Sequence, residues 1–155
     1  MEINSSNEIF RKLRMTIYME IHLKIIGFIL IVLAFVHIIF PRYFAWKEQL
    51  KSLTLINKQM MYVHTFFIAV TTLLIGVLCA LCAKDLVTTF FGQKIAFGLA
   101  LFWVMRLFFQ FFVYSKELWR GKIFETCVHI IFSIIWLYIS IVFSLVALNT
   151  SFQLY

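Results

Sequence analysis

Four long apolar runs constrain the fold of this chain more than any other feature of its sequence. They cover residues 21–40, 61–83, 95–114 and 123–148. Each is close to the roughly 20 residues that a helix needs to cross the hydrocarbon core of a bilayer. Because lipid offers no hydrogen-bond partners, spanning segments fold as helices or closed barrels. The sequence therefore predicts an all-α membrane protein, a four-helix transmembrane bundle of up-down-up-down topology, in a single domain over residues 1–155.

The composition agrees with a chain embedded in a bilayer. Hydrophobic residues make up 63% of the sequence and charged residues only 14%, whereas soluble domains are about 25% charged. The net charge of +7 is spread over the ends of the apolar runs, where it can meet anionic lipid head groups. The expected partners are therefore membrane lipids, with other membrane subunits or a second copy of the chain as open alternatives. No soluble domain remains to bind nucleic acid.

Residues 1–20 are basic and carry an apolar stripe. Ile9, Leu13 and Ile17 share one helical face, while Arg11 and Arg14 lie on the other. This pattern favours an amphipathic interfacial helix, separate from the first span or continuous with it; a short soluble overhang is the alternative. Basic residues divide almost evenly between the two membrane sides, so the positive-inside rule gives no orientation. The basic N-terminal segment favours cytoplasmic termini, and we expect a bacterial inner membrane.

The third apolar run contains a cation. Arg106 and Gln110 have apolar residues on both sides. Insertion scales give such an arginine a cost of roughly 2.5–3.5 kcal/mol, so it is expected to face the bundle interior and to have a partner there. Trp103 and Tyr114 share the helix face of Arg106 and Gln110. Glu125, on the fourth run, is the expected counter-charge.

Three histidines are predicted to lie in the same half of the bilayer as Arg106. With an up-down path and a rise of about 1.5 Å per residue, His37, His64 and His129 all fall near one membrane surface. Polar faces in lipid turn inward, so these side chains are expected to meet. The predicted intramembrane pocket consists of His37, His64, His129, Arg106, Gln110 and Glu125.

Three kinds of function fit this pocket. Neutral imidazoles from facing helices suit haem or a transition metal, with His37, His64 and His129 as ligands, in a small redox subunit. Arg106 suits a haem propionate, a quinone carbonyl or an anionic lipid group. The alternatives are a structural polar layer in a non-enzymatic interaction or assembly protein, and a conduit for protons or ions. No motif assigns a catalytic residue, so enzymatic activity stays open.

Cysteines and small residues mark the second apolar run. Cys79 and Cys82 form a C-x-x-C pair, but redox-active pairs need an electropositive, partly exposed site. Packing as small buried side chains is the favoured interpretation. Small-residue stripes let helix backbones approach closely in lipid. The stripe of this run is Thr72, Gly76, Ala80 and Ala83.

Several short segments carry a family resemblance. They are Asn57-Lys58-Gln59 with His64-Thr65-Phe66-Phe67, Arg106 with Gln110-Phe111-Phe112-Val113-Tyr114, and Glu117-Leu118-Trp119-Arg120-Gly121 with Phe124-Glu125-Thr126 and His129. Together they resemble an uncharacterised family of small four-helix bacterial integral membrane proteins, over roughly residues 20–148. The resemblance implies a four-helix membrane fold and brings no activity, cofactor or partner with it.

Overall fold

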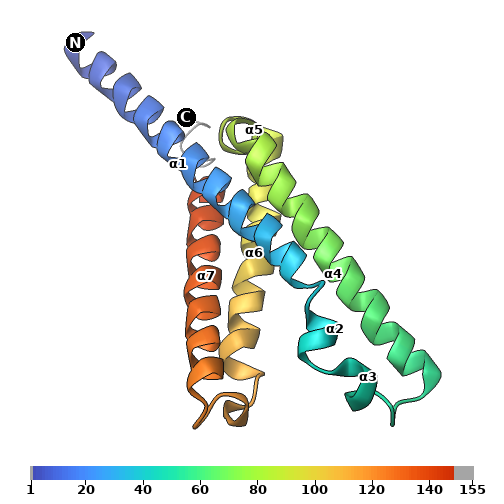
Figure 1. Cartoon of the computed structure of the whole chain (residues 1–155). Helices are drawn as coiled ribbons and strands as arrows, with labels where there is room; N and C mark the ends of the chain where they lie inside the picture. Colours follow the sequence, from blue (N-terminus) through green and yellow to red (C-terminus); the bar gives the residue numbers. More distant parts are fainter. Residues whose placement is uncertain (1, 149–155) are drawn as a thin grey trace. The chain divides into compact units, whose positions relative to one another are not determined.

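The computed structural model describes residues 2–148, which form helices and turns with no strand among them. Four helices are long and apolar enough to cross a membrane, as the sequence predicts (Figure 1). They are α1 (Glu2–Val36), α4 (Leu55–Leu81), α6 (Phe90–Phe112) and α7 (Ile123–Leu148). The shorter elements are α2 (Phe40–Tyr43), α3 (Trp46–Gln49), α5 (Ala83–Thr88) and the 3-10 helix η1 (Lys116–Leu118). The up-down-up-down order of the four spans stays a prediction.

The N-terminal segment and the first span form one helix. α1 runs without a break from Glu2 to Val36, so residues 2–20 are not a separate element. Neither glycine nor proline occurs before Gly27, and extending an existing helix costs little once its first turn has formed. Whether the first 20 residues lie on the membrane surface stays a prediction.

The chain divides into two compact units, and α1 contributes to both. The first unit contains residues up to Glu20 and from Lys84 on, and the second contains Ile21–Ala83. The single domain expected from the sequence stays a prediction.

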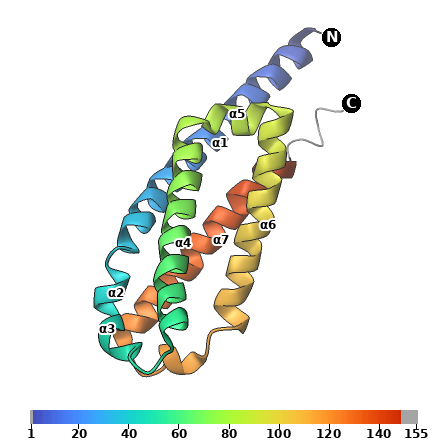
Figure 2. The ribbon, with the colours of Figure 1, turned by 90° about the vertical axis from the view of Figure 1, so that its right-hand side faces the viewer.

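In the first unit, α6 and α7 form an antiparallel hairpin with extensive mutual contact (Figures 1 and 2). Two small residues of α6, Ala96 and Ala100, are buried, and small residues let neighbouring helices approach closely. The indole rings of Trp103 and Trp136 stack between the helices with centroids 4.9 Å apart. At the start of α6, the Thr89 hydroxyl accepts a hydrogen bond from the Gly92 backbone N–H at 2.9 Å, which caps the helix.

In the second unit, α1 and α4 cross in backbone contact. A Cβ atom added to Gly27 would lie 2.8 Å from the backbone oxygen of Gly76, and one added to Gly76 would lie 2.9 Å from Cγ1 of Ile31. Cys79, on the same face of α4, is fully buried and its thiol is free. The part of the small-residue stripe around Gly76 and Ala80 is therefore a packing surface, as predicted, whereas Ala83 lies beyond α4, at the start of α5.

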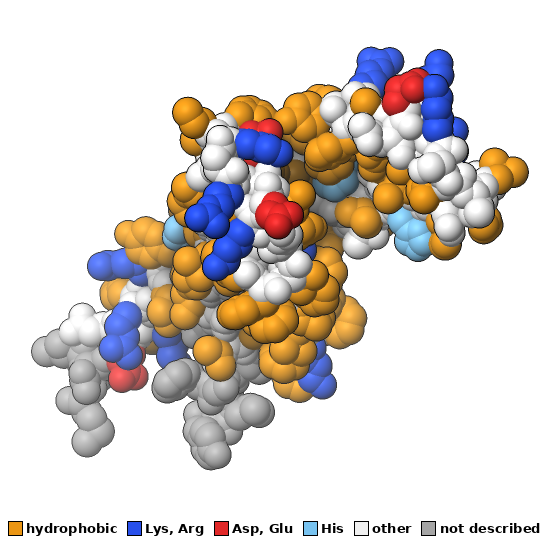
Figure 3. Space-filling view, turned by 90° about the horizontal axis from the view of Figure 1, so that it is seen from below, with side chains coloured by type: hydrophobic (Ala, Val, Ile, Leu, Met, Phe, Trp, Pro, Cys, Tyr) orange, Lys and Arg blue, Asp and Glu red, His pale blue; other side chains and the backbone are white. Residues whose placement is uncertain are grey.

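The outer faces of the helices are apolar. Hydrophobic side chains cover much of the face seen in Figure 3, and the lysines, arginines and carboxylates gather there in small groups. An apolar surface of this extent is unfavourable in water and favourable in a bilayer. The four helices and this surface together support a membrane location.

Candidate functional site

A cluster of polar and aromatic side chains lies at the loop end of the α6–α7 hairpin. Gln110 is its centre and is 94% buried, with 6% of its surface exposed. Its Oε1 accepts a hydrogen bond from Arg106 Nη1 at 3.2 Å, one helical turn earlier on α6. Its Nε2 lies 2.8 Å from Nδ1 of His129 on α7. We call the following set the polar cluster: Arg106, Gln110, Tyr114, Trp119, His129 and Trp136.

The hydrogen bonds of Gln110 determine which nitrogen of His129 carries the proton. A guanidinium can only donate, so the Gln110 oxygen faces Arg106 and the amide NH₂ faces His129. The NH₂ group donates, and His129 Nδ1 must therefore accept. The neutral imidazole then carries its hydrogen on Nε2. His129 is thus left with one N–H donor for a further group.

Aromatic rings hold the His129 imidazole in place. Trp119 stacks on it with centroids 3.8 Å apart and an angle of 10° between the planes. Phe111 approaches it edge-on, with centroids 6.3 Å apart. The Thr126 hydroxyl lies within hydrogen-bond distance of two backbone oxygens, that of Trp119 at 2.8 Å and that of Lys122 at 2.7 Å, and donation to either ties α7 to the turn before it. The stacked indole therefore limits motion of the imidazole perpendicular to its plane, and the Phe111 ring limits motion within that plane.

Arg106 is half-buried and lies against aromatic faces. Its Cζ is 5.2 Å from the ring centroid of Trp136 and 5.6 Å from that of Tyr114. The negative face of an aromatic ring attracts a cation. Among residues 2–148 the guanidinium forms no ion pair with a carboxylate, so the predicted pairing with Glu125 is not formed. The aromatic ring faces and the Gln110 side-chain carbonyl stabilise the positive charge of Arg106 instead. Glu125 lies in the first turn of α7, where the helix dipole favours an acidic residue.

An open apolar groove begins at the polar cluster. It has a volume of about 360 Å³, and His129 is part of its wall. Ser133, also in the wall, donates its hydroxyl hydrogen to the His129 backbone oxygen at 2.8 Å. The Ser133 hydroxyl therefore has no hydrogen left to donate to a ligand. The groove therefore offers an apolar surface, with His129 among the residues of its wall. Its lining residues are Phe111, His129, Ile130, Ser133, Ile134 and Leu137.

His37 and His64 belong to the second unit and have the opposite tautomer. Nδ1 of His37 lies 2.7 Å from the Leu33 carbonyl oxygen, and Nδ1 of His64 lies 2.8 Å from that of Met60. A carbonyl only accepts, so each Nδ1 donates and each neutral ring keeps a lone pair on Nε2. These two histidines have the tautomer that suits a metal ligand, and His129 does not.

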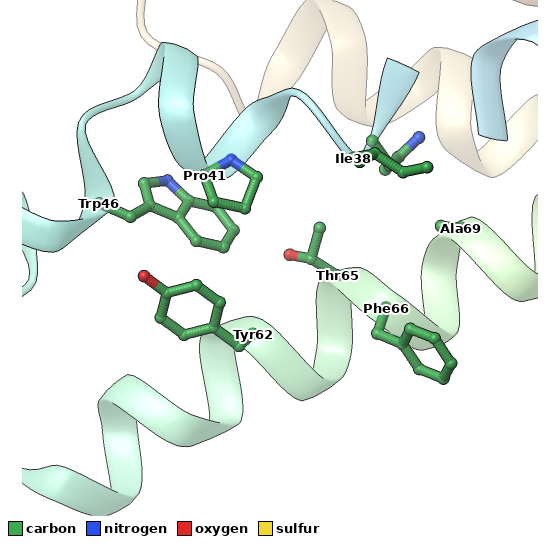
Figure 4. Close-up of a pocket in the computed structure, with 8 residues that line it drawn as sticks. Ile38, Pro41, Trp46, Tyr62, Thr65, Phe66 and Ala69 are labelled. Atoms are coloured by element: carbon green, nitrogen blue, oxygen red, sulfur yellow. The ribbon is translucent and has the colours of Figure 1, made fainter. Parts of the chain in front are cut away.

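His37 lines a small aromatic hollow of about 210 Å³. At one end, Trp46 of α3 and Tyr62 of α4 meet edge to face with centroids 5.2 Å apart. At the other end lie Phe66 and Ala69, both from α4 (Figure 4). The hollow is almost wholly apolar apart from His37 and a few hydroxyl and indole groups.

The structure brings together three of the six predicted pocket residues: Arg106, Gln110 and His129. The joint pocket with His37, His64 and Glu125 stays a prediction. Among the described His, Cys, Asp and Glu residues, no group of three or more could hold a metal ion, so the predicted haem or metal site is not supported. Sequence reasoning missed Trp119, because a residue in a turn shows no helical periodicity.

Comparison with known proteins assigns no family to the chain. No family model, no curated protein and no solved structure matches it. Fold alone does not determine function, so the chemistry of the polar cluster and its groove is the remaining guide to what the chain does.

Proposed function

We propose that this chain is an integral membrane subunit that binds a quinone-like ligand at the polar cluster. The proposal depends above all on the tautomer of His129, which leaves an Nε2–H donor on a residue of the groove wall. A quinone carbonyl is an acceptor without a hydrogen of its own, and its isoprenoid tail is apolar. The carbonyl would accept from His129, and the tail would lie along the groove.

Arg106 would favour an electron-rich oxygen at the same place. Its charge has no carboxylate partner among the described residues, and electrostatic attraction is stronger at low dielectric than in water. The chain would bind and position the quinone, while a neighbouring membrane subunit would supply or accept electrons. No catalytic residue is assigned. A haem or metal bound by His129 is disfavoured, because its Nδ1 accepts where a metal-ligating histidine usually donates.

A structural polar layer is the second candidate. Gln110 and His129 are hydrogen-bonded across the hairpin and Trp119 stacks on the imidazole, and such contacts fix the register of two helices. In this case the chain would be an assembly or interaction protein that contacts lipids, other membrane subunits or a second copy of itself. The third candidate from the sequence, a conduit for protons or ions, stays a prediction.

A binding titration separates the first two candidates. The full chain in lipid nanodiscs is titrated with a decyl-substituted benzoquinone, with decylbenzene as the matched ligand without carbonyls. Trp119 stacks on His129, so the fluorescence difference between wild type and Trp119→Phe reports the site. We expect saturable binding of the quinone only, weakened at least tenfold by His129→Phe, which keeps a flat ring but has no donor.

The control variant is Cys127→Ala, an exposed position of α7 outside the groove. It should bind as wild type does. Equal binding of both ligands, or unchanged binding by His129→Phe, contradicts the proposal. If His129→Phe lowers thermal stability and no quinone binds, the structural layer is favoured. A Soret band in the purified protein would point to haem and against both.

We further propose a bacterial inner membrane as the location, with both termini cytoplasmic. The basic face of residues 1–20 and the family resemblance support this placement. Alkaline phosphatase and green fluorescent protein fused after Tyr155 test the orientation. Fluorescence without phosphatase activity is expected, and the reverse result would place the C-terminus outside.

A further inference from the structure

Three polar atoms in the α6–α7 interface are buried without a protein partner. They are Nε1 of Trp103, Nε1 of Trp136 and Oγ of Ser140, which belong to side chains only 3%, 4% and 4% exposed. In the described part of the chain none of the three makes a hydrogen bond to protein. Buried polar groups in native proteins almost always have a partner, so three in one interface indicate that something else bonds to them.

Ser140 differs from two other hydroxyl residues of the spanning helices, Ser133 and Thr72, whose hydroxyls are bonded within their own helices. Ser133, two turns earlier on α7, donates to the His129 backbone oxygen at 2.8 Å. Thr72 of α4 donates to the Ile68 backbone oxygen at 2.8 Å. A helical serine can satisfy its hydroxyl on the carbonyl four residues back, and Ser140 does not. Its hydroxyl is therefore available to a group in the interface.

The three atoms belong to one strip of the interface. Trp103 and Trp136 stack with centroids 4.9 Å apart, and Ser140 follows Trp136 by one helical turn on the same face of α7. An indole N–H only donates, so neither tryptophan can satisfy the other. What is required is a small group with acceptor capacity that can also donate to, or accept from, a serine hydroxyl.

We infer that ordered water occupies the α6–α7 interface and bonds to Trp103, Trp136 and Ser140. Water has the required donor and acceptor capacity, and buried waters typically make about three hydrogen bonds to such groups. The hydrated strip continues the polar cluster beyond Trp136, on whose ring Arg106 lies. From His129 to Ser140 it extends roughly 16 Å along α7, about half of the hydrocarbon core. This inference does not depend on quinone binding.

Hydroxyl-radical labelling tests the inference, since radicals form from water next to the labelled residue. The full chain in nanodiscs is pulsed with X-rays and analysed by mass spectrometry. We expect Trp103 and Trp136 to be oxidised within threefold of the half-exposed Trp119, after normalisation for intrinsic reactivity. Phe143, which is fully buried, is the dry control. Protection of both tryptophans at the level of Phe143 would overturn the inference.

Serine variants make the test specific to this strip. Ser140→Ala should lower the oxidation of Trp136 at least twofold, and Ser140→Thr, which keeps a hydroxyl, should restore most of it. Ser133→Ala is the matched control and should leave Trp136 unchanged, because the Ser133 hydroxyl is bonded within its own helix. Equal labelling in all three variants contradicts the inference. Labelling that changes when chloride is replaced by gluconate would show a bound anion in place of water.

Discussion

Nε2 of Gln110 lies 2.8 Å from Nδ1 of His129, and this contact joins α6 to α7 across the intervening turn. Because Gln110 also accepts from Arg106, a change at any one of the three alters what the other two can bond to. An amide whose oxygen accepts from a cation presents its NH₂ group to Nδ1 of the imidazole, and the neutral ring then carries its hydrogen on Nε2. The chemistry of the groove therefore depends on a residue that does not line it.

Replacement of Gln110 by leucine should destabilise the hairpin. The variant Gln110→Leu leaves Nδ1 of His129 without its donor and removes the bond to Arg106, and an unsatisfied buried polar group costs about 1–3 kcal/mol. Thermal unfolding in detergent, followed by circular dichroism, measures the effect. Gln49→Leu, at an exposed position of α3, should unfold as wild type does. Equal stability of both variants would show that the Gln110–His129 bond contributes nothing.

The stack of Trp119 on His129 should depend on ring shape more than on the indole N–H. Trp119→Ala removes a stacked pair, which is worth about 0.5–1.5 kcal/mol, and should destabilise the turn before α7 by that amount. Trp119→Phe keeps a flat ring and should recover at least half of the loss. Urea unfolding of the two variants in mild detergent measures the difference. If they are equally destabilised, the stack is not the cause.

The spans were predictable because hydropathy acts over the whole length of a helix. α7 has the bounds that the sequence predicts, 123–148. α4 begins at Leu55, earlier than predicted, because Lys58 looks like part of a polar connection. A helix does not stop where its polarity changes, since its backbone bonds continue. The continuity of α1 was left open in the sequence for the same reason.

The site was only partly predictable. The one-turn spacing of Arg106 and Gln110 places them on one face, and the shared depth of Gln110 and His129 follows from span lengths alone. The partner of Arg106 was wrongly expected to be Glu125, because charge matching in a sequence favours a carboxylate. Aromatic faces attract a cation without a second buried charge, and no periodicity in the sequence indicates that Trp119 would turn back onto His129.

The crossing of α1 and α4 should be sensitive to a single methyl group. Gly76→Ala places a Cβ 2.9 Å from Cγ1 of Ile31 and 3.0 Å from the Gly27 backbone oxygen, so the helices must separate, at a cost of about 1–3 kcal/mol. Gly98→Ala is the matched control, because a Cβ there meets nothing within 4 Å. It should be neutral or stabilising, since alanine favours a helix over glycine. Thermal unfolding in detergent compares the two, and equal melting temperatures would mean that the crossing is not close-packed.

Arg106 should oppose membrane insertion while supporting ligand binding. Arg106→Met keeps much of the length of the side chain and removes the charge, so insertion of the third span should become more favourable by about 2.5–3.5 kcal/mol. A glycosylation-scored insertion assay on residues 90–112 measures this, with Leu107→Met as the uncharged control at the next position. In the quinone titration the same variant should bind more weakly than wild type, because the positive field at the carbonyl is lost. If the variant inserts better and binds the quinone equally well, Arg106 does not contribute to ligand binding. Its role would then be helix packing through Trp136 and Gln110.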